Sequence, residues 1–315
     1  MIPYSPIIAV IGIGTYLSLA LLATGLIWLF IRSLKGKEVD RRVIFVFVFF
    51  AVAAPLIFPT TFEDHASDIV KKVFDKVDNL PEGSTVLISF DFDPAMAPEV
   101  QPMANAFTRH LLTKNHKVVF MSLWATGQAL TNTTLDVVVR REFPDKKEGV
   151  DFANLGYKAG NQGVLNVIVT NFKKMFPNDS RNIPLDSMPL FTGINSCRDL
   201  DLILSVGGGF PGPKEWVLFV GDPANVPIGV GVAAVSAPNY YPYYPKQMLG
   251  LLGGIKGAAE YESELRRVYP QLASMPTPAL IMMGPQTLAH VVVMSFIIIG
   301  NVAFFVARRK KREGA

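Results

Sequence analysis

The sequence is poor in the residues that build disulfides and zinc sites. It has one cysteine, Cys197, among 315 residues, which excludes an intrachain disulfide and a cysteine-based zinc site. None of its four histidines has HExxH spacing, so a zinc protease of that type is excluded too. Cys197 has no histidine near it in the sequence, and we therefore expect a buried thiol in apolar surroundings.

Charge is also scarce, and much of it lies beside long apolar runs. Charged residues make up 18% of the chain and hydrophobic residues 50%, with a mean hydropathy of +0.31. Runs at residues 7–31, 43–58 and 287–307 predict three transmembrane helices. The first run has 25 uncharged residues, long enough for a hydrocarbon core of ~30 Å. It is too long for a signal peptide, and no basic residue precedes it.

The second run has only 16 residues, which leaves two interpretations open. Arg41 and Arg42 can snorkel at one end, and Pro55 is expected to kink the last turns. The alternative is a buried core helix. Hydrophobicity on all faces argues against a half-exposed helix.

The distribution of basic residues predicts an orientation. The loop 32–42 carries five basic and two acidic residues, and the tail after Ala307 carries five basic and one acidic. Basic short loops stay in the cytoplasm, so we expect the N-terminus outside and both of these segments inside. The chain then belongs to the plasma membrane of a prokaryote, with residues 60–276 as an extracytoplasmic domain. His290 and Asn301 are polar residues within the third run, and we expect His290 near the interface.

The segment between the spans predicts an α/β domain. Apolar strand patterns alternate with helix patterns, which indicates a Rossmann-like, mostly parallel sheet of about five strands with helices on both faces. An amphipathic helix at 62–77 leads into the domain, with Lys71, Lys72 and Lys76 facing away from it. We expect strands at 85–92, 117–124, 150–155, 200–206 and 228–235, helices at 98–114, 126–143, 162–176 and 248–268, a helix or strand at 213–220, and a stiff proline-rich link at 270–286.

Ligands of open α/β sheets bind beyond the carboxyl ends of the strands, and Asp91 and Asp93 follow the first strand. Strand alternation points both to one side, where two carboxylates favour a divalent cation such as Mg²⁺ or one raised pKa. The alternative is that Asp93 and Pro94 begin a turn and cap the next helix.

This pair resembles the DxD motif of haloacid-dehalogenase-like phosphatases. The resemblance implies a nucleophilic Asp91, a role for Ser122 at the end of the second strand, a phosphate-neutralising Lys158 and a magnesium-holding Asp222. Pro94 directly after the pair, and the lack of a second acidic residue close to Asp222, depart from that pattern.

Three further groups are candidate ligand contacts. The segment 156–163 precedes a helix, and its backbone N–H groups with Lys158 can hold an anion, although it has neither GxGxxG nor GxxxxGK[ST]. A glycine run after a strand lets a ligand approach the backbone, and a tyrosine-rich segment suits a ligand wall or an interface. The alternative for the segment 156–163 is a tight turn, and that for the glycine run is a flexible connection. The alternative for the tyrosine-rich segment is packing of the loop on its own domain. The residues concerned are Tyr157, Lys158, Asn161, Gly207, Gly208, Gly209, Ser236, Asn239, Tyr240 and Tyr241.

Other catalytic arrangements have little support. Ser236 lacks a G-x-S-x-G setting. His65, His110 and His116 fall at helix ends or in loops, and we expect His116 in a surface turn.

Three stretches, FDFDPAMAPEVQPMANAFTRHLL, DFANLGYKAG and SAPNYYPYYPKQMLGLLGGIKGAAEYE, resemble a family of uncharacterised bacterial membrane-anchored proteins. The likeness covers most of residues 84–265. It implies the architecture and no activity.

The hypothesis that these observations favour is a membrane-tethered module that binds a protein partner or ligand, as a subunit of a membrane complex or as a homo-oligomer. Gly14, Ser18 and Gly25 form a small-residue stripe on the first span that suits helix packing. The alternatives are a metal-dependent phosphohydrolase using Asp91 and Asp93, and a sensor or transport accessory protein. The charge pattern is that of membrane flanks, so no nucleic-acid partner is expected. No cofactor is expected outside the Mg²⁺ of the enzyme alternative.

Overall fold

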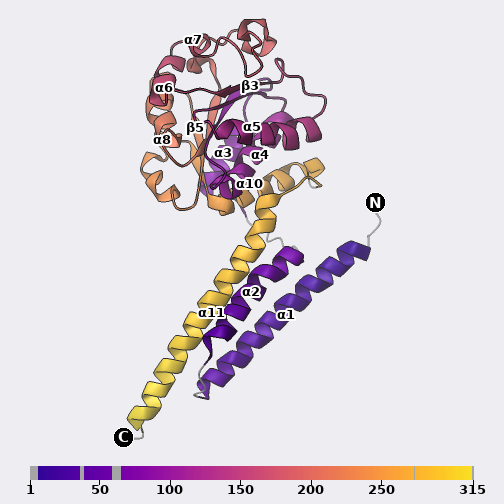
Figure 1. Ribbon diagram of the computed structural model, residues 1–315, viewed down its shortest axis with the longest axis vertical. Coiled ribbons are helices and arrows are strands. Elements are labelled where there is room, and N and C mark those ends of the chain that lie inside the picture. Colours follow the sequence, from indigo (N-terminus) through magenta and orange to yellow (C-terminus); the bar gives the residue numbers. More distant parts are fainter. Residues whose placement is uncertain (1–5, 36–38, 59–64, 273, 314–315) are drawn as a thin grey trace. The chain divides into compact units, whose positions relative to one another are not determined.

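The computed structural model describes residues 6–35, 39–58, 65–272 and 274–313, without the side chains of 6–15 and 310–313. The chain forms two compact units, one made of Met1–Phe62 with Leu280–Ala315 and one made of Glu63–Ala279. The first is built of long helices and the second of a sheet covered by helices (Figure 1).

The helices of the first unit are α1 (Pro6–Leu34), α2 (Arg41–Ile57) and α11 (Pro278–Glu313). Within them, Tyr16–Leu34 and Pro278–Arg309 are long and apolar enough to cross a membrane. α2 has 17 residues, or roughly 25 Å of helix, less than the ~30 Å hydrocarbon core. By length and composition, two helices are therefore candidate membrane spans, and the span predicted at α2 stays a prediction. α11 begins within the expected proline-rich link and contains Pro285.

The packing of the three helices includes a glycine of α1 against a ring of α2, and an aromatic pair between α2 and α11. A Cβ on Gly25 of α1 would lie 2.6 Å from Cζ of Phe47 on α2, so only glycine admits this ring. Phe47 in turn meets Phe296 of α11 edge-on, with 5.8 Å between ring centroids. Of the predicted small-residue stripe, Gly25 thus packs against the chain's own α2, while Gly14 lies among the residues without described side chains.

The second unit contains a six-stranded, wholly parallel sheet in the order β3-β2-β1-β4-β5-β6. This is the strand order of doubly wound dinucleotide-binding folds, so the α/β class predicted from the sequence is confirmed. The strands are β1 (Thr85–Asp91), β2 (Lys117–Ser122), β3 (Phe152–Tyr157), β4 (Leu202–Gly207), β5 (Ile228–Val232) and β6 (Gly250–Gly253).

Helices cover both faces of the sheet (Figure 1). The glycines of β5 allow the helices on one face of the sheet to pack closely against this strand. A Cβ on Gly229 would lie 3.0 Å from Val73 of α3, and one on Gly231 would lie 2.9 Å from Sδ of Met103 on α4. The helices of this unit are α3 (Asp68–Asp78), α4 (Ala97–Thr113), α5 (Gly127–Thr134), α6 (Gln162–Ile168), α7 (Phe172–Met175), α8 (Pro213–Trp216), α9 (Asp222–Ala224) and α10 (Gly254–Val268), with π-helical turns at Leu135–Arg140 and Val217–Gly221.

Several elements differ from their predicted form. The segment 248–268 holds β6 as well as α10, because a four-residue apolar strand has no measurable period of its own. The segment 162–176 is interrupted where the side chain of Asn171 accepts a hydrogen bond from the Lys174 backbone and starts α7. The segment 213–220 is helical.

The first and last helices of the α/β unit, α3 and α10, are joined along their length. The Glu260 carboxylate accepts hydrogen bonds from the backbone N–H (3.0 Å) and the hydroxyl (2.6 Å) of Ser67. Further along, Lys71 Nζ lies 3.7 Å from Glu264, and the Tyr269 hydroxyl donates to Asp78. The residue numbers increase in the same direction along both helices from one contact to the next, so the two helices run parallel.

Candidate functional site

The strand order reverses between β1 and β4, and their carboxyl ends mark the place where doubly wound folds bind ligands. Asp91, the last residue of β1, pairs with Gly207, the last residue of β4. The predicted candidates Asp91, Asp93 and the glycine run therefore lie at this switch point.

The Asp91 carboxylate points into the protein and has three donors. Its Oδ2 accepts from Ser89 Oγ (2.6 Å) and Trp216 Nε1 (2.7 Å), and its Oδ1 accepts from Leu123 N (2.8 Å). Burial raises the pKa of Asp91 to about 6, although these hydrogen bonds favour the ionised form. A fully buried carboxylate with both oxygens engaged holds β1, β2 and α8 together.

The Asp93 carboxylate has a different partner. Its Oδ1 accepts from Met96 N (3.1 Å), and its backbone carbonyl accepts from Met96 N and Ala97 N. This geometry is that of a turn leading into α4, so the two carboxylates do not share a partner. Among the described residues, no group of three His, Cys, Asp or Glu side chains is arranged to hold a metal ion.

The glycine run extends further than its three consecutive glycines. From Gly207 to Gly212 it has the spacing GxGxxG between a strand and a helix, which is the fingerprint of dinucleotide-binding loops. That spacing is the signal in the sequence that identifies this loop. In such loops the glycines let a pyrophosphate approach the backbone at the helix N-terminus.

In this chain the space beside each glycine is filled by the protein itself. A Cβ on Gly207 would lie 2.4 Å from the Asp91 carbonyl oxygen, one on Gly209 2.4 Å from the ring of Trp124, and one on Gly212 2.5 Å from the Gly209 carbonyl oxygen. The run therefore serves close packing between the loop and its neighbours.

The helix N-terminus after the run is also occupied. Oε2 of Glu215 accepts the backbone N–H of Gly212 at 2.9 Å, and Glu215 is buried. A carboxylate thus takes the donor that a phosphate would need and repels an anion there. The loop has the spacing of a nucleotide site without the electrostatics of one.

Ser122 and Trp124 complete the closure of the switch point. Ser122 Oγ is buried within hydrogen-bond distance of the carbonyl oxygens of Phe90 (2.6 Å) and Trp124 (2.7 Å). The Trp124 indole donates to the carbonyl oxygen of Pro211 (2.7 Å) and so ties the loop after β2 to the glycine loop. Ser122 is a part of the scaffold in this arrangement.

The candidates at the end of β3 and after it are nearer the surface. The backbone N–H of Lys158 donates to Ser122 O (3.0 Å), and its ammonium lies 5.6 Å from the centroid of the Phe176 ring. Asn161 has a positive φ of 48° and makes no side-chain cap for α6. Tyr157 is exposed. These residues form an open turn, and Asp222, implied by the phosphatase resemblance, binds Gln247 elsewhere.

The tyrosine-rich segment divides into a buried and an exposed part. Tyr240 is buried, and burial raises the pKa of Tyr240 to about 12. Tyr241 and Asn239 are exposed, and Ser236 is half-buried near Gly208. Tyr240 is therefore part of the core, whereas the Tyr241 side chain lies at the surface.

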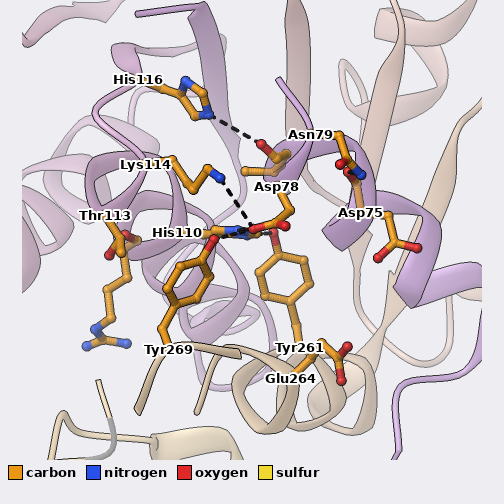
Figure 2. A network of polar contacts seen from close by, with 12 residues as sticks. Asp75, Asp78, Asn79, His110, Thr113, Lys114, His116, Tyr261, Glu264 and Tyr269 are labelled. Carbon is orange, nitrogen blue, oxygen red and sulfur yellow. Dashed lines mark hydrogen bonds and ion pairs between the residues drawn. The ribbon is translucent and has the colours of Figure 1, made fainter. Parts of the chain in front are cut away.

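A second polar cluster lies at the opposite, amino end of the sheet, where α3, α4 and α10 meet. Asp78 binds His110 Nε2 (3.3 Å) and the Tyr269 hydroxyl, and Lys114 Nζ lies 3.8 Å away (Figure 2). His110 Nδ1 lies 2.8 Å from the Tyr261 hydroxyl. Since Asp78 can only accept, Nε2 carries the proton of the neutral ring and Nδ1 accepts from Tyr261.

The environment keeps His110 neutral. Burial lowers the pKa of His110 to about 4 against the opposing effect of Asp78, and Phe74 stacks on the ring at 4.4 Å. The expectation of a surface turn at His116 is wrong, because its side chain is buried and its Nε2 lies 3.3 Å from the Val77 carbonyl oxygen. Partners up to 191 residues apart in sequence leave no local signal of this cluster.

Cys197 is buried, as predicted, and burial raises the pKa of its thiol.

The chain was compared with protein-family models, with curated proteins and with solved structures, and none of them matches it.

Proposed function

We propose that the α/β domain is an extracytoplasmic module that binds a protein partner through the carboxyl edge of its sheet, as a subunit of a membrane complex. The supporting observation is a set of exposed apolar side chains on neighbouring loops at that edge. Val235 is 86% exposed, Phe210 62% and Tyr241 55%. Exposed aromatic and aliphatic side chains on a fixed scaffold are typical of protein interfaces.

The three side chains belong to one surface because their loops touch. A Cβ on Gly208 would lie 3.5 Å from Ser236 Oγ, which places the loop of Phe210 beside the loop of Val235. The Tyr240 side chain is hydrogen-bonded to the backbone of Lys214. Because Lys214 follows the glycine loop by two residues, Tyr241 lies near that loop. Three acidic residues of this edge, Asp93, Glu99 and Glu215, accept backbone N–H groups of the protein itself.

The test is purification of the full chain in mild detergent, with the mass of the native complex as the readout. The double variant Phe210→Ser with Val235→Ser should lose the partner, whether a second protein or a second copy. Val150→Ser, at a position 42% exposed elsewhere in the domain, should keep it. A wild-type chain that runs alone as a monomer contradicts the proposal.

The proposed topology has three spans, with α2 as the short one. Its support is that α2 exposes apolar side chains such as Phe45, Phe49 and Ile57 along its whole length, which suits lipid on the faces that do not touch α1. With Cys197 buried, single cysteines at Glu82, Lys35 and Arg308 can report sidedness. An impermeant maleimide should label Glu82→Cys on intact cells and the other two only after lysis. Labelling of Lys35→Cys together with Glu82→Cys contradicts a crossing by α2.

One observation favours the phosphohydrolase alternative, namely a carboxyl of raised pKa at the switch point. Under that alternative, Asp93→Asn, which leaves the fold's buried hydrogen bonds in place, abolishes Mg²⁺-dependent hydrolysis of an aryl phosphate. Turnover that is absent in the wild type, or unchanged in Asp93→Asn, removes the enzyme from consideration.

A further inference from the structure

α1 and α2 leave an apolar groove between them, apart from the packing of Gly25 on Phe47. Its volume is about 550 Å³, and its lining includes Leu21, Phe49, Phe50 and Ala53. Along α2 the lining runs from Val46 to Phe58, about 18 Å of helix. That length is close to one leaflet, half of the ~30 Å hydrocarbon core.

The shape of the groove suits a flexible hydrocarbon chain better than another helix. Helices pack closely in membranes through small residues that let backbones approach. Here the exposed Leu21, Phe49 and Phe50 project beside a half-buried Ala53, and the glycine of α1 that faces α2 is already covered by Phe47. A rigid helix would rest on the large side chains, whereas a single acyl chain can enter between them.

Positive charge lies at one end of the groove. Arg41 and Arg42 open α2, and Val46 at the start of the lining is one turn beyond Arg42. Both arginine side chains are exposed, and the Asp40 carboxylate beside them accepts the backbone N–H of Arg42 (2.8 Å). Arginine binds phosphate through two parallel N–H donors, so this end matches the phosphate of a lipid whose chain fills the groove.

We propose that the groove between α1 and α2 binds one anionic phospholipid, with an acyl chain between the helices and the phosphate beside Arg41 and Arg42. The site rests on the proposed membrane placement of α2. Labelling of Lys35→Cys together with Glu82→Cys on intact cells shows that this placement has failed, and it is scored before any lipid is added.

The experiment uses the full chain, delipidated in mild detergent and titrated with phosphatidylglycerol or phosphatidylcholine of identical acyl chains. Native mass spectrometry reads the complexes. We expect a one-to-one complex that binds phosphatidylglycerol about tenfold more tightly, a preference worth about 1.4 kcal/mol. Ala53→Phe should lower the affinity at least tenfold. Ala303→Phe, also half-buried on a membrane helix, should leave it unchanged.

The headgroup end is tested by charge removal. Arg41→Gln with Arg42→Gln should abolish the preference for phosphatidylglycerol, and Arg308→Gln with Arg309→Gln should retain it. Equal binding of the two lipids by the wild type overturns the phosphate assignment. Equal affinities of the Ala53→Phe and Ala303→Phe variants overturn the groove as the site.

A second readout does not depend on filling the groove. One equivalent of phosphatidylglycerol with brominated chains should quench the added tryptophan of Phe49→Trp and not that of Phe305→Trp. The two positions are 65% and 60% exposed, so they differ in location and not in access. Equal quenching of both tryptophans overturns the proposal.

Discussion

The two ends of the sheet hold their ionisable groups in opposite ways. At the carboxyl end, Asp93, Glu99 and Glu215 accept from backbone N–H groups, and Asp91 accepts from backbone, indole and hydroxyl donors. At the amino end, Asp78 and His110 are held by side chains that also titrate. The carboxyl end therefore has fixed partners, and the amino end is joined by groups whose charge changes with pH.

The largest effect should come from breaking the fixed end. Asp91→Ala leaves the Trp216 indole, the Ser89 hydroxyl and the Leu123 N–H without their acceptor. We expect the unfolding free energy of the full chain to fall by about 3–5 kcal/mol, read from urea unfolding followed by Trp216 fluorescence. A loss below about 1 kcal/mol means that these donors find other partners.

The two ends should also respond to pH with opposite sign. The pKa of Asp91 is raised from 3.8 to about 6, so its contribution to stability is present below pH 3.8 and is lost as the pH rises through about 6. The pKa of His110 is lowered from 6.5 to about 4, so its contribution is present above pH 6.5 and is lost as the pH falls through about 4. Each contribution is of order 3 kcal/mol at most.

Removing one of the two groups should leave only the pH dependence of stability that the other group causes. Compared with the wild type, His110→Asn should gain stability on acidification between pH 6.5 and 4, and Asp91→Asn should lose it. Urea midpoints measured across this range give both slopes. Parallel slopes in the two variants contradict the assignment.

A smaller effect is expected from trimming the amino end. Tyr269→Phe removes only the hydroxyl that donates to Asp78, which lies partly in solvent. We expect a loss of about 1 kcal/mol and, because that hydrogen bond lowers the pKa of Asp78, a rise in this pKa, measured by the carboxyl chemical shift in NMR. An unchanged pKa of Asp78 shows that the hydrogen bond is absent in solution.

The smallest effect should come from the turn at the carboxyl end. Asp93→Ala removes one acceptor at the half-exposed start of α4, and we expect a loss of about 0.5–1 kcal/mol. Urea unfolding under the same conditions, with Asp91→Ala beside it, compares the two carboxylates directly. Equal losses contradict their different roles.

The sheet could be read from the sequence because most of its first five strands are apolar runs between breaks, and β3, which contains Asn154, is the weakest of them. Strand residues are buried whichever face of the sheet they point to, among them Val86, Val119 and Ile203. The strands therefore read as apolar runs without alternation. β6 could not, because its four residues lie next to a longer helical pattern. Strand order follows from pairing between distant segments, which no local period encodes.

The candidate site was predictable in place and not in chemistry. The carboxyl ends of β1 and β4 follow from the fold class, so Asp91 and Gly207 were expected near one another. That the Asp91 carboxylate turns toward Trp216, 125 residues away, depends on tertiary packing. The same holds for Glu215, whose burial at the glycine loop decides the charge of that loop.

The parallel pairing of α3 and α10 has a mechanical consequence. The chain enters the pair at Ser67, before α3, and leaves it at Tyr269, after α10, at the other end. Tension between these two ends loads the Glu260, Glu264 and Asp78 contacts together, in shear, instead of peeling them one at a time. A force applied between Ser67 and Tyr269 is thereby spread over the whole helix pair before it reaches the sheet.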